Sequence, residues 1–180
     1  LHLLDLSRPL TNLKADMSKS CRHSINKSKN IFLNKTVFTN AYEAVRRLQK
    51  LHFSASARIT RPLETWHNIE SMVNAGDAFI IEAWHNGQCV ASSLFIVNTT
   101  TCLYSISAAN RELFDLPVNH ALVWEAIQIA KERGCSNFEF GSLTYSTNDM
   151  TIGKKEKNIN RFKRNFGGST HMQLDLKLAL

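Results

Sequence analysis

The sequence lacks any long hydrophobic run, so no segment reaches the roughly 18 apolar residues that a transmembrane helix needs. Its first residues also lack the pattern of a signal peptide. The chain has no Cys-x-x-Cys pair and no closely spaced set of cysteine and histidine, because its cysteines are scattered at Cys21, Cys89, Cys102 and Cys135. These absences indicate reduced thiols in a cytoplasmic protein, with no transmembrane segment and no metal site.

Acidic residues are few, since 15 aspartates and glutamates stand against 22 lysines and arginines and leave a net charge of +7 in 180 residues. This excess indicates an anionic partner, which could be a nucleic acid, a phosphate-bearing cofactor or an anionic surface. No internal repeat is present, and 43% hydrophobic residues suffice for a core. We therefore expect one domain over residues 1–180. Because the chain begins at Leu1 rather than Met, we expect it to be excised from a longer protein; its oligomeric state is not indicated.

Much of the positive charge gathers near the C-terminal end of the chain. Six basic residues and one acid lie within residues 154–164. The apolar residues Ile159, Phe162 and Phe166 recur at helical spacing, which predicts a docked helix with a basic outer face. The glycine pair 167–168 is expected to end this helix with positive φ angles.

The rest of the chain alternates helical and extended patterns. Apolar residues at helical spacing predict further helices over residues 10–29, 42–52, 63–73 and 119–133. Asn40 followed by Glu43 resembles a capping box at the start of the second of these. Runs with strand composition or alternation lie at residues 1–6, 31–38, 78–84, 88–97, 102–108, 138–142 and 171–178. Asn86-Gly87 fits a type I′ turn between two of these strands.

This order of elements predicts an α/β (α+β) fold with a mixed, largely antiparallel central sheet flanked by helices. The unit formed by strand 102–108, helix 119–133 and strand 137–142 favours a parallel strand pair with a right-handed crossover. We expect the functional site in this unit.

Two runs of sequence resemble the FemAB-type branch of the GNAT acyltransferase superfamily. The first, LVWEAIQIAKERGCSNFEFGS at residues 122–142, predicts a helix ending in glycine and a strand ending in an acid-aromatic-glycine triplet at 139–141. The second, NRFKRNFGG at residues 160–168, contains a Phe-Lys-x-x-Phe-Gly-Gly motif. The resemblance is weak before Gly87 and good over residues 121–168.

The resemblance implies a GNAT-like fold and transfer of an acyl or aminoacyl group to an amine-bearing acceptor. Relatives of this type take amino acids from charged tRNA to build peptidoglycan cross-bridges, or use acyl-coenzyme A. The implied donor is therefore acyl-CoA or aminoacyl-tRNA, and the implied role lies in cell-envelope, peptidoglycan or polysaccharide biosynthesis. By the same resemblance, Phe162 and Lys163 match the family's functionally important Phe-Lys pair, in the region that handles the anionic donor. FemAB-type proteins usually carry two GNAT-like units, and this chain has the length for one.

Relatives that use acyl-CoA cradle its pyrophosphate in a glycine-containing loop before a helix. Between Ala108 and Ala121 this chain contains no glycine, so close wrapping of a pyrophosphate by the backbone is not expected there. Side chains would then have to meet the negative charge of the donor. The available cations are Arg111, Arg161, Lys163 and Arg164.

Three residues are candidates for direct roles. Lys163 is the first candidate, as an anchor for donor phosphate, and the alternative is a solvated lysine beside Phe162. Glu139 lies between two phenylalanines of a strand, and it is either a general base or a structural acid paired with a basic residue of segment 154–164. His120, at the start of a helix, is a second candidate base or an ordinary satisfied or solvent-facing histidine.

A non-enzymatic interpretation is also open. The basic segments 19–29 and 154–164 could together grip RNA through its phosphates, in a salt-sensitive manner. No RNA-binding aromatic motif accompanies them. A degenerate GNAT module within a larger protein would have the same sequence pattern. Turnover of an acyl or aminoacyl donor distinguishes an enzyme from both.

Overall fold

The computed structural model describes residues 1–28, 34–38, 41–110, 112, 116–147 and 151–172. Its helices are α1 (Leu10–Asp16), α2 (Lys19–Ser28), α3 (Tyr42–Ser56), α4 (Leu63–Ala75), α5 (Val118–Glu132) and α6 (Lys154–Arg164). Its strands are β1 (His2–Asp5), β2 (Asn34–Phe38), β3 (Ala78–His85), β4 (Gln88–Val97), β5 (Thr101–Ala109), β6 (Asn137–Glu139) and β7 (Ser169–Thr170). None of the helices in these residues has the length and apolar character needed to span a membrane.

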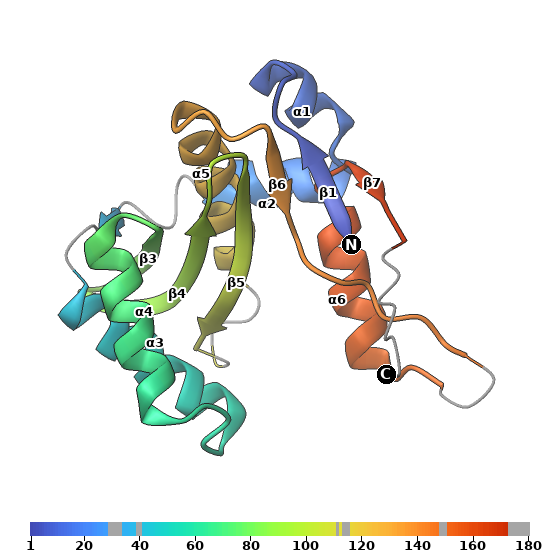
Figure 1. Ribbon diagram of the computed structural model, residues 1–180. Helices are drawn as coiled ribbons and strands as arrows, with labels where there is room; N and C mark the ends of the chain where they lie inside the picture. The colour runs from blue at the N-terminus through green and yellow to red at the C-terminus, as the bar shows by residue number, and fades with distance from the viewer. Residues whose placement is uncertain (29–33, 39–40, 111, 113–115, 148–150, 173–180) are drawn as a thin grey trace, which may run out of the picture.

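The strands within the described residues form one sheet in the order β2-β3-β4-β5-β6-β1-β7 (Figure 1). β5 and β6 pair in parallel, and every other neighbouring pair is antiparallel. The predicted mixed, largely antiparallel sheet is therefore confirmed, together with the parallel crossover through α5. The hairpin between β3 and β4 is also confirmed, because Asn86 and Gly87 have φ angles of 49° and 76°, as a type I′ turn requires.

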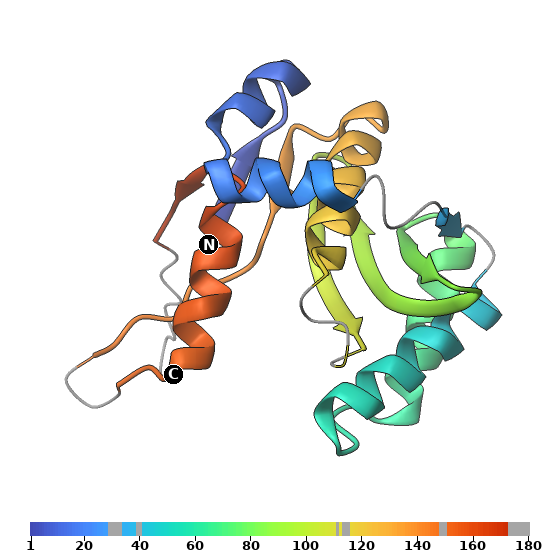
Figure 2. The ribbon, with the colours of Figure 1, turned by 180° about the vertical axis from the view of Figure 1, so that it is seen from behind.

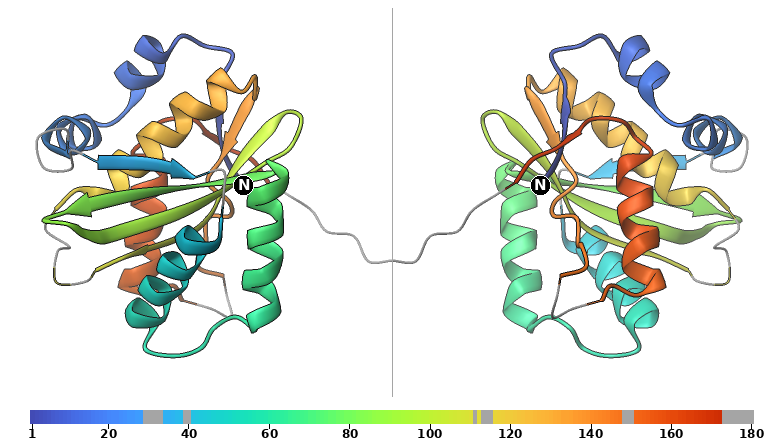
Figure 3. Two further views of the ribbon diagram at one scale, coloured as in Figure 1. Left: turned by 90° about the vertical axis from the view of Figure 1, so that its left-hand side faces the viewer. Right: turned by 90° about the vertical axis from the view of Figure 1, so that its right-hand side faces the viewer.

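Helices cover both faces of the sheet (Figures 1 and 3). Side chains alternate along each strand, so Ile80 and Leu94 join the core beneath α3 and α4, whereas Phe79 and Phe95 join the core beneath α5. α2 packs on α5, as the reverse view shows (Figure 2). The predicted helices over 63–73 and 119–133 are confirmed, and the apolar residues of both helices face the sheet.

The prediction of one continuous helix over 10–29 is wrong, because the chain turns between α1 and α2. Met17 has an extended ψ of 150°, and the hydroxyl of Ser18 accepts a hydrogen bond from the backbone N–H of Cys21 at 3.1 Å. This is the geometry of a new helix start. The guanidinium of Arg22 reaches back and donates to two carbonyl oxygens at the end of α1. Polar capping thus overrides the apolar spacing.

Other differences lie at the ends of elements. α3 continues to Ser56, beyond the predicted end, and its N-terminal flanking residue is Ala41, which makes no side-chain cap. Asn40 lies outside the described residues, so the capping box is not tested. The strand predicted at 171–178 also falls largely outside them; β7 is instead a two-residue strand at Ser169–Thr170.

The N-terminal strand β1 joins two strands from the C-terminal part of the chain, β6 and β7. β1 inserts between β6 and β7, with Leu4 opposite Phe138 and His2 opposite Thr170. The region after α6 is therefore tied through β1 to the strand that carries Glu139.

Candidate active site

The site lies where β5 and β6 separate. The two strands pair from Thr101 to Leu103 opposite Asn137 to Glu139, and no further pairing between them occurs in the described residues. β5 continues to Ala109, whereas β6 ends at Glu139, which corrects the predicted strand over 137–142. After Glu139 the chain leaves the sheet toward α6 and so diverges from β5 (Figure 1).

Aromatic side chains pack across this opening. Phe162 of α6 and Phe166, two residues beyond the end of this helix, lie with ring centroids 5.3 Å apart. Phe162 contacts Tyr104 of β5 at 6.5 Å, and Phe166 contacts Phe140 after β6 at 5.4 Å. α6 thereby bridges the diverging strands with apolar rings, which fixes the position of the motif that contains Lys163.

Lys163 lies half-buried next to the segment that leaves β6. Its Nζ donates a hydrogen bond to the backbone carbonyl oxygen of Ser142 at 2.8 Å. Burial lowers the pKa of Lys163, and the negative charge of Glu139 opposes this shift. The ammonium group is therefore held by the backbone near a carboxylate, with little of the freedom of a surface lysine.

Glu139 is the last residue of β6 and is half-buried. It pairs across the sheet with Leu3 of β1. Its charge acts on Lys163, yet no ion pair within 4.0 Å joins the two among the described residues. Within segment 154–164, Glu139 therefore interacts electrostatically with Lys163, without a direct ion pair.

His120 occupies the first turn of α5 and faces the same aromatic cluster. Its ring lies 5.0 Å from that of Phe162 in an edge contact and 5.8 Å from that of Phe166 in a stacked one. Burial lowers the pKa of His120, so the imidazole is neutral at pH 7. No hydrogen-bond partner of its ring is found in the described part of the chain.

The remaining cations lie at the edge of this arrangement. Arg161 and Arg164 are exposed on α6, and Arg161 donates a hydrogen bond to Asn158 at 3.3 Å. Arg111 lies outside the described residues. The structure thus brings Phe162 against His120 and Lys163 near Glu139, and leaves the two arginines on the outer face of the helix.

Two buried polar residues that hold this region were not anticipated. Asn160 is 4% exposed, and its amide accepts from the backbone N–H of Thr144 at 3.1 Å and donates to the carbonyl of the same residue at 2.5 Å. His2 is 2% exposed; its Nε2 lies 2.8 Å from the carbonyl oxygen of Gly167. Ile159, expected on the buried face of α6, is 43% exposed. Apolar spacing on this helix predicted that its neighbour Ile159 would be buried, and a polar residue such as Asn160 carries no signal for burial in that pattern.

A polar network lies on β4 and β5 behind the aromatic cluster. The hydroxyl of Ser93 donates to that of Ser107 at 2.9 Å, and Ser107 donates to the side chain of Asn119 at 3.3 Å. The hydroxyl of Tyr104 shares hydrogen bonds with both serines. Asn119 precedes His120, so the network ties the start of α5 to the sheet next to the candidate base.

No group of three or more potential metal-ligating side chains is found in the described residues. The four cysteines are unpaired thiols. Burial raises the pKa of Cys21, Cys89 and Cys102 to about 12, so these thiols are protonated at pH 7.

The parallel pair of β5 and β6, which diverges beside the basic helix α6, agrees with the GNAT-like fold that the sequence predicts. The chain belongs to the acetyltransferase (GNAT) domain family, whose profile matches residues 29–172. No curated protein sequence matches the chain significantly.

Solved structures support the same fold. FemX superimposes with a TM-score of 0.75 at 13% identity, over 93% of this chain and 58% of FemX. L-PGS from Bacillus licheniformis gives a TM-score of 0.67 at 14% identity, over 93% and 56% of the two chains. AAC(6')-Iy, in complex with a coenzyme A bisubstrate analogue, gives 0.60 at 7% identity, over 82% and 99%. The chain therefore spans little more than half of FemX and L-PGS.

Proposed function

We propose that this domain transfers an acyl or aminoacyl group from acyl-CoA or aminoacyl-tRNA to an amine acceptor, in cell-envelope, peptidoglycan or polysaccharide biosynthesis in the cytoplasm. The observation that supports it most is the docking of Phe162 and Lys163 beside the divergence of β5 and β6. In this family fold, that divergence is the position where a donor carbonyl approaches backbone N–H groups. The similarity to FemX and L-PGS favours the aminoacyl branch, and the complex of AAC(6')-Iy keeps acyl-CoA as the second donor.

In this proposal, cationic side chains bind the negatively charged phosphates of the donor. The residues between Ala108 and Ala121 contain no glycine, so a cradle of closely approaching backbone N–H groups has no support there. Lys163 donates a hydrogen bond to the segment that follows β6, and Arg161 and Arg164 lie exposed on the same helix. Arg111 is the fourth candidate. A lysine already partly desolvated attracts a phosphate more strongly than a fully hydrated one.

Acyl transfer also requires that the amine lose a proton and that the developing oxyanion be stabilised. His120 is neutral at pH 7 and can accept that proton, because burial lowers its pKa. Glu139, whose charge faces Lys163, is better suited to hold the lysine's position and charge. We therefore assign His120 as the base and Glu139 as the partner of Lys163.

Donor binding tests the proposal directly. Thermal shift and calorimetry would compare acetyl-CoA, a long-chain acyl-CoA, and charged and uncharged tRNA at two salt concentrations. Selective binding of charged tRNA supports the aminoacyl branch, and stabilisation by a coenzyme A ester supports the other. Equal binding of charged and uncharged tRNA without turnover would instead make the chain an RNA-binding module. No response to any donor would favour a degenerate domain that acts within a larger protein.

We expect Lys163→Ala to reduce donor affinity or turnover at least tenfold without unfolding the protein. The loss follows from removal of the partly desolvated charge next to β6. Lys155→Ala, on the exposed first turn of the same helix, is the matched control for charge and helix propensity. A folded Lys163→Ala variant that works as well as the control would remove the main support for the proposed donor site.

The assignment of the base gives a separate prediction. We expect His120→Gln to lower kcat about 100-fold or more, in the range typical of general base removal. We expect Glu139→Gln to act mainly on KM for the donor. In the parent enzyme, kcat/KM falls as pH drops through the His120 pKa, which lies below the ordinary 6.5. Rate profiles against pH check this: an acid limb that persists in His120→Gln and vanishes in Glu139→Gln would reverse the assignment.

A further inference from the structure

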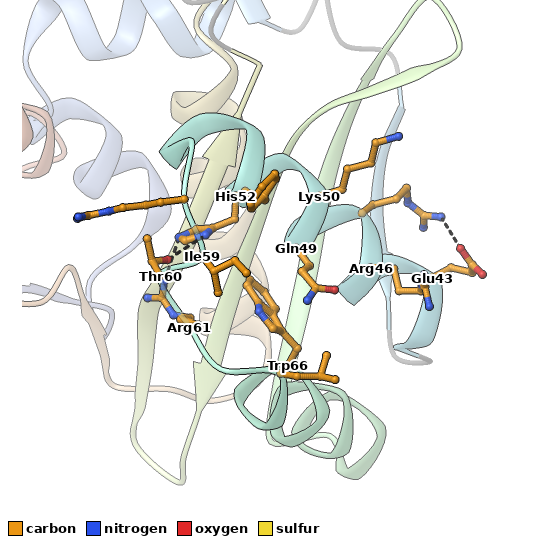
Figure 4. A pocket seen from close by; sticks show the side chains of 13 residues that line it. Glu43, Arg46, Gln49, Lys50, His52, Ile59, Thr60, Arg61 and Trp66 are labelled. Atoms are coloured by element: carbon orange, nitrogen blue, oxygen red, sulfur yellow. Dashed lines mark hydrogen bonds and ion pairs between the residues drawn. The ribbon is translucent and has the colours of Figure 1, made fainter.

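A concave surface lies at the end of the α3–α4 hairpin, and none of His120, Glu139 and Lys163 lines it. It has a volume of about 700 Å³ and is formed by α3, the connecting loop and the start of α4. Figure 4 shows Trp66 at its floor, with His52, Thr60 and Arg61 on one side and Glu43, Arg46 and Lys50 on the other. We call this surface the α3–α4 pocket.

The α3–α4 pocket is strongly cationic. Its only acid is Glu43, against the five cations Arg46, Arg47, Lys50, Arg58 and Arg61. Glu43 lies 3.8 Å from Arg47, which also binds Glu82. No ion pair engages the other four cations in the described residues. They therefore present positive charge to a ligand outside the chain.

The same surface exposes large apolar side chains. Ile59 is 81% exposed, Leu63 62% and Phe53 54%, and all three line the α3–α4 pocket. Grouped exposure of this kind indicates an interaction site, because such side chains are ordinarily buried. Cations around protruding aliphatic and aromatic groups are the pattern of surfaces that enter the headgroup region of a membrane.

Hydrogen bonds hold the loop that carries these residues. Arg61 donates to Nε2 of His52 at 2.9 Å. The hydroxyl of Ser56 donates to the carbonyl oxygen of Arg58 at 2.6 Å, and Ala57 adopts the left-handed conformation with φ 54°. The apolar side chain of Ile59 is thus presented by a shaped turn and does not collapse onto the helices.

We propose that the α3–α4 pocket docks on a membrane surface rich in anionic lipid. Arg46, Lys50 and Arg58 contact lipid phosphates, while Ile59, Leu63 and Phe53 enter among the acyl chains. RNA is a poorer occupant, because exposed aliphatic side chains such as Ile59 and Leu63 offer no stacking surface for bases. The proposal rests on the pocket alone and holds whether or not the domain transfers acyl groups.

Vesicle co-sedimentation of the 180-residue chain tests the proposal. The probes are vesicles of phosphatidylcholine alone and vesicles with 30% phosphatidylglycerol, at low and high salt. We expect at least tenfold stronger binding to the anionic vesicles, weakened by salt. Ile59→Ser/Leu63→Ser and Lys50→Glu/Arg58→Glu should each reduce that binding at least tenfold. These side chains are exposed, so thermal unfolding should be unchanged.

Lys19→Glu/Lys27→Glu, on the exposed face of α2, is the control with the same change of charge. It should retain most of the binding, and an equal loss in this control would overturn the proposal. The proposal would also be overturned if the parent protein did not bind anionic vesicles. Binding of an RNA oligonucleotide that is lost in Lys50→Glu/Arg58→Glu and kept in Ile59→Ser/Leu63→Ser, with no vesicle binding, would assign the surface to RNA instead.

Discussion

Replacing Gly168 by alanine is expected to lower the free energy of unfolding by about 2 to 5 kcal/mol. The residue has a φ of +86°, and a Cβ there would lie 2.2 Å from the backbone carbonyl oxygen of Leu3. The left-handed conformation costs an alanine about 1 to 2 kcal/mol. The overlap with backbone adds about 1 to 3 kcal/mol, because β1 must shift. Since β1 also pairs with Glu139, we expect donor binding to fall as well.

Urea unfolding of the variant measures this loss. Gly134→Ala is the matched control, since Gly134 has a φ of +82° and its Cβ would meet nothing within 4 Å. The control isolates the cost of the left-handed conformation. Equal stabilities of Gly168→Ala and Gly134→Ala would show that contact with β1 contributes nothing.

Replacing Arg47 by methionine is expected to destabilise the protein by about 3 to 5 kcal/mol, as loss of one partner of a buried ion pair does. Glu82 on β3 is 0% exposed, and its Oε1 accepts a hydrogen bond from Nε of Arg47 at 2.8 Å. The indole of Trp84 donates to the other oxygen at 3.2 Å. Without the guanidinium, the buried carboxylate keeps only uncharged hydrogen-bond partners among the described residues, the indole of Trp84 and the thiol of Cys89.

The sign of the pH dependence gives an independent check. Burial raises the pKa of Glu82 above 4.5, while Arg47 opposes the shift. In Arg47→Met the folded-state pKa rises further, so the folded protein binds a proton that the unfolded chain releases near pH 4.5. The variant should therefore be more stable at pH 5 than at pH 8. Arg47→Met/Glu82→Gln should recover most of the lost stability; if it does not, the pair's charges are not the cause.

Local signals in the sequence predicted much of the fold. The Asn86-Gly87 turn marks the hairpin because few other residues accept two consecutive positive φ angles. The apolar spacing of α5 and the glycine pair after α6 were equally informative. The Phe162-Lys163 motif pointed to the helix that lies at the strand divergence.

The buried polar residues were missed because their environment comes from distant segments. His2 and Gly167 are 165 positions apart, and their hydrogen bond exists only after β1 enters the sheet. Asn160 is buried because the segment after β6 returns to α6, and no neighbour in sequence reveals that path.

The periodicity of apolar residues, the turn chemistry and the family motif are local properties, so the chain's elements, its crossover and its family follow from the sequence. The insertion of β1 and the buried Arg47–Glu82 pair depend on contacts between distant segments. The break between α1 and α2 and the cationic α3–α4 pocket come from shorter-range polar contacts and loop shape, which the periodicity of apolar residues does not report. Burial and desolvation exist only in the packed protein, and they set the pKa of His120 and Lys163.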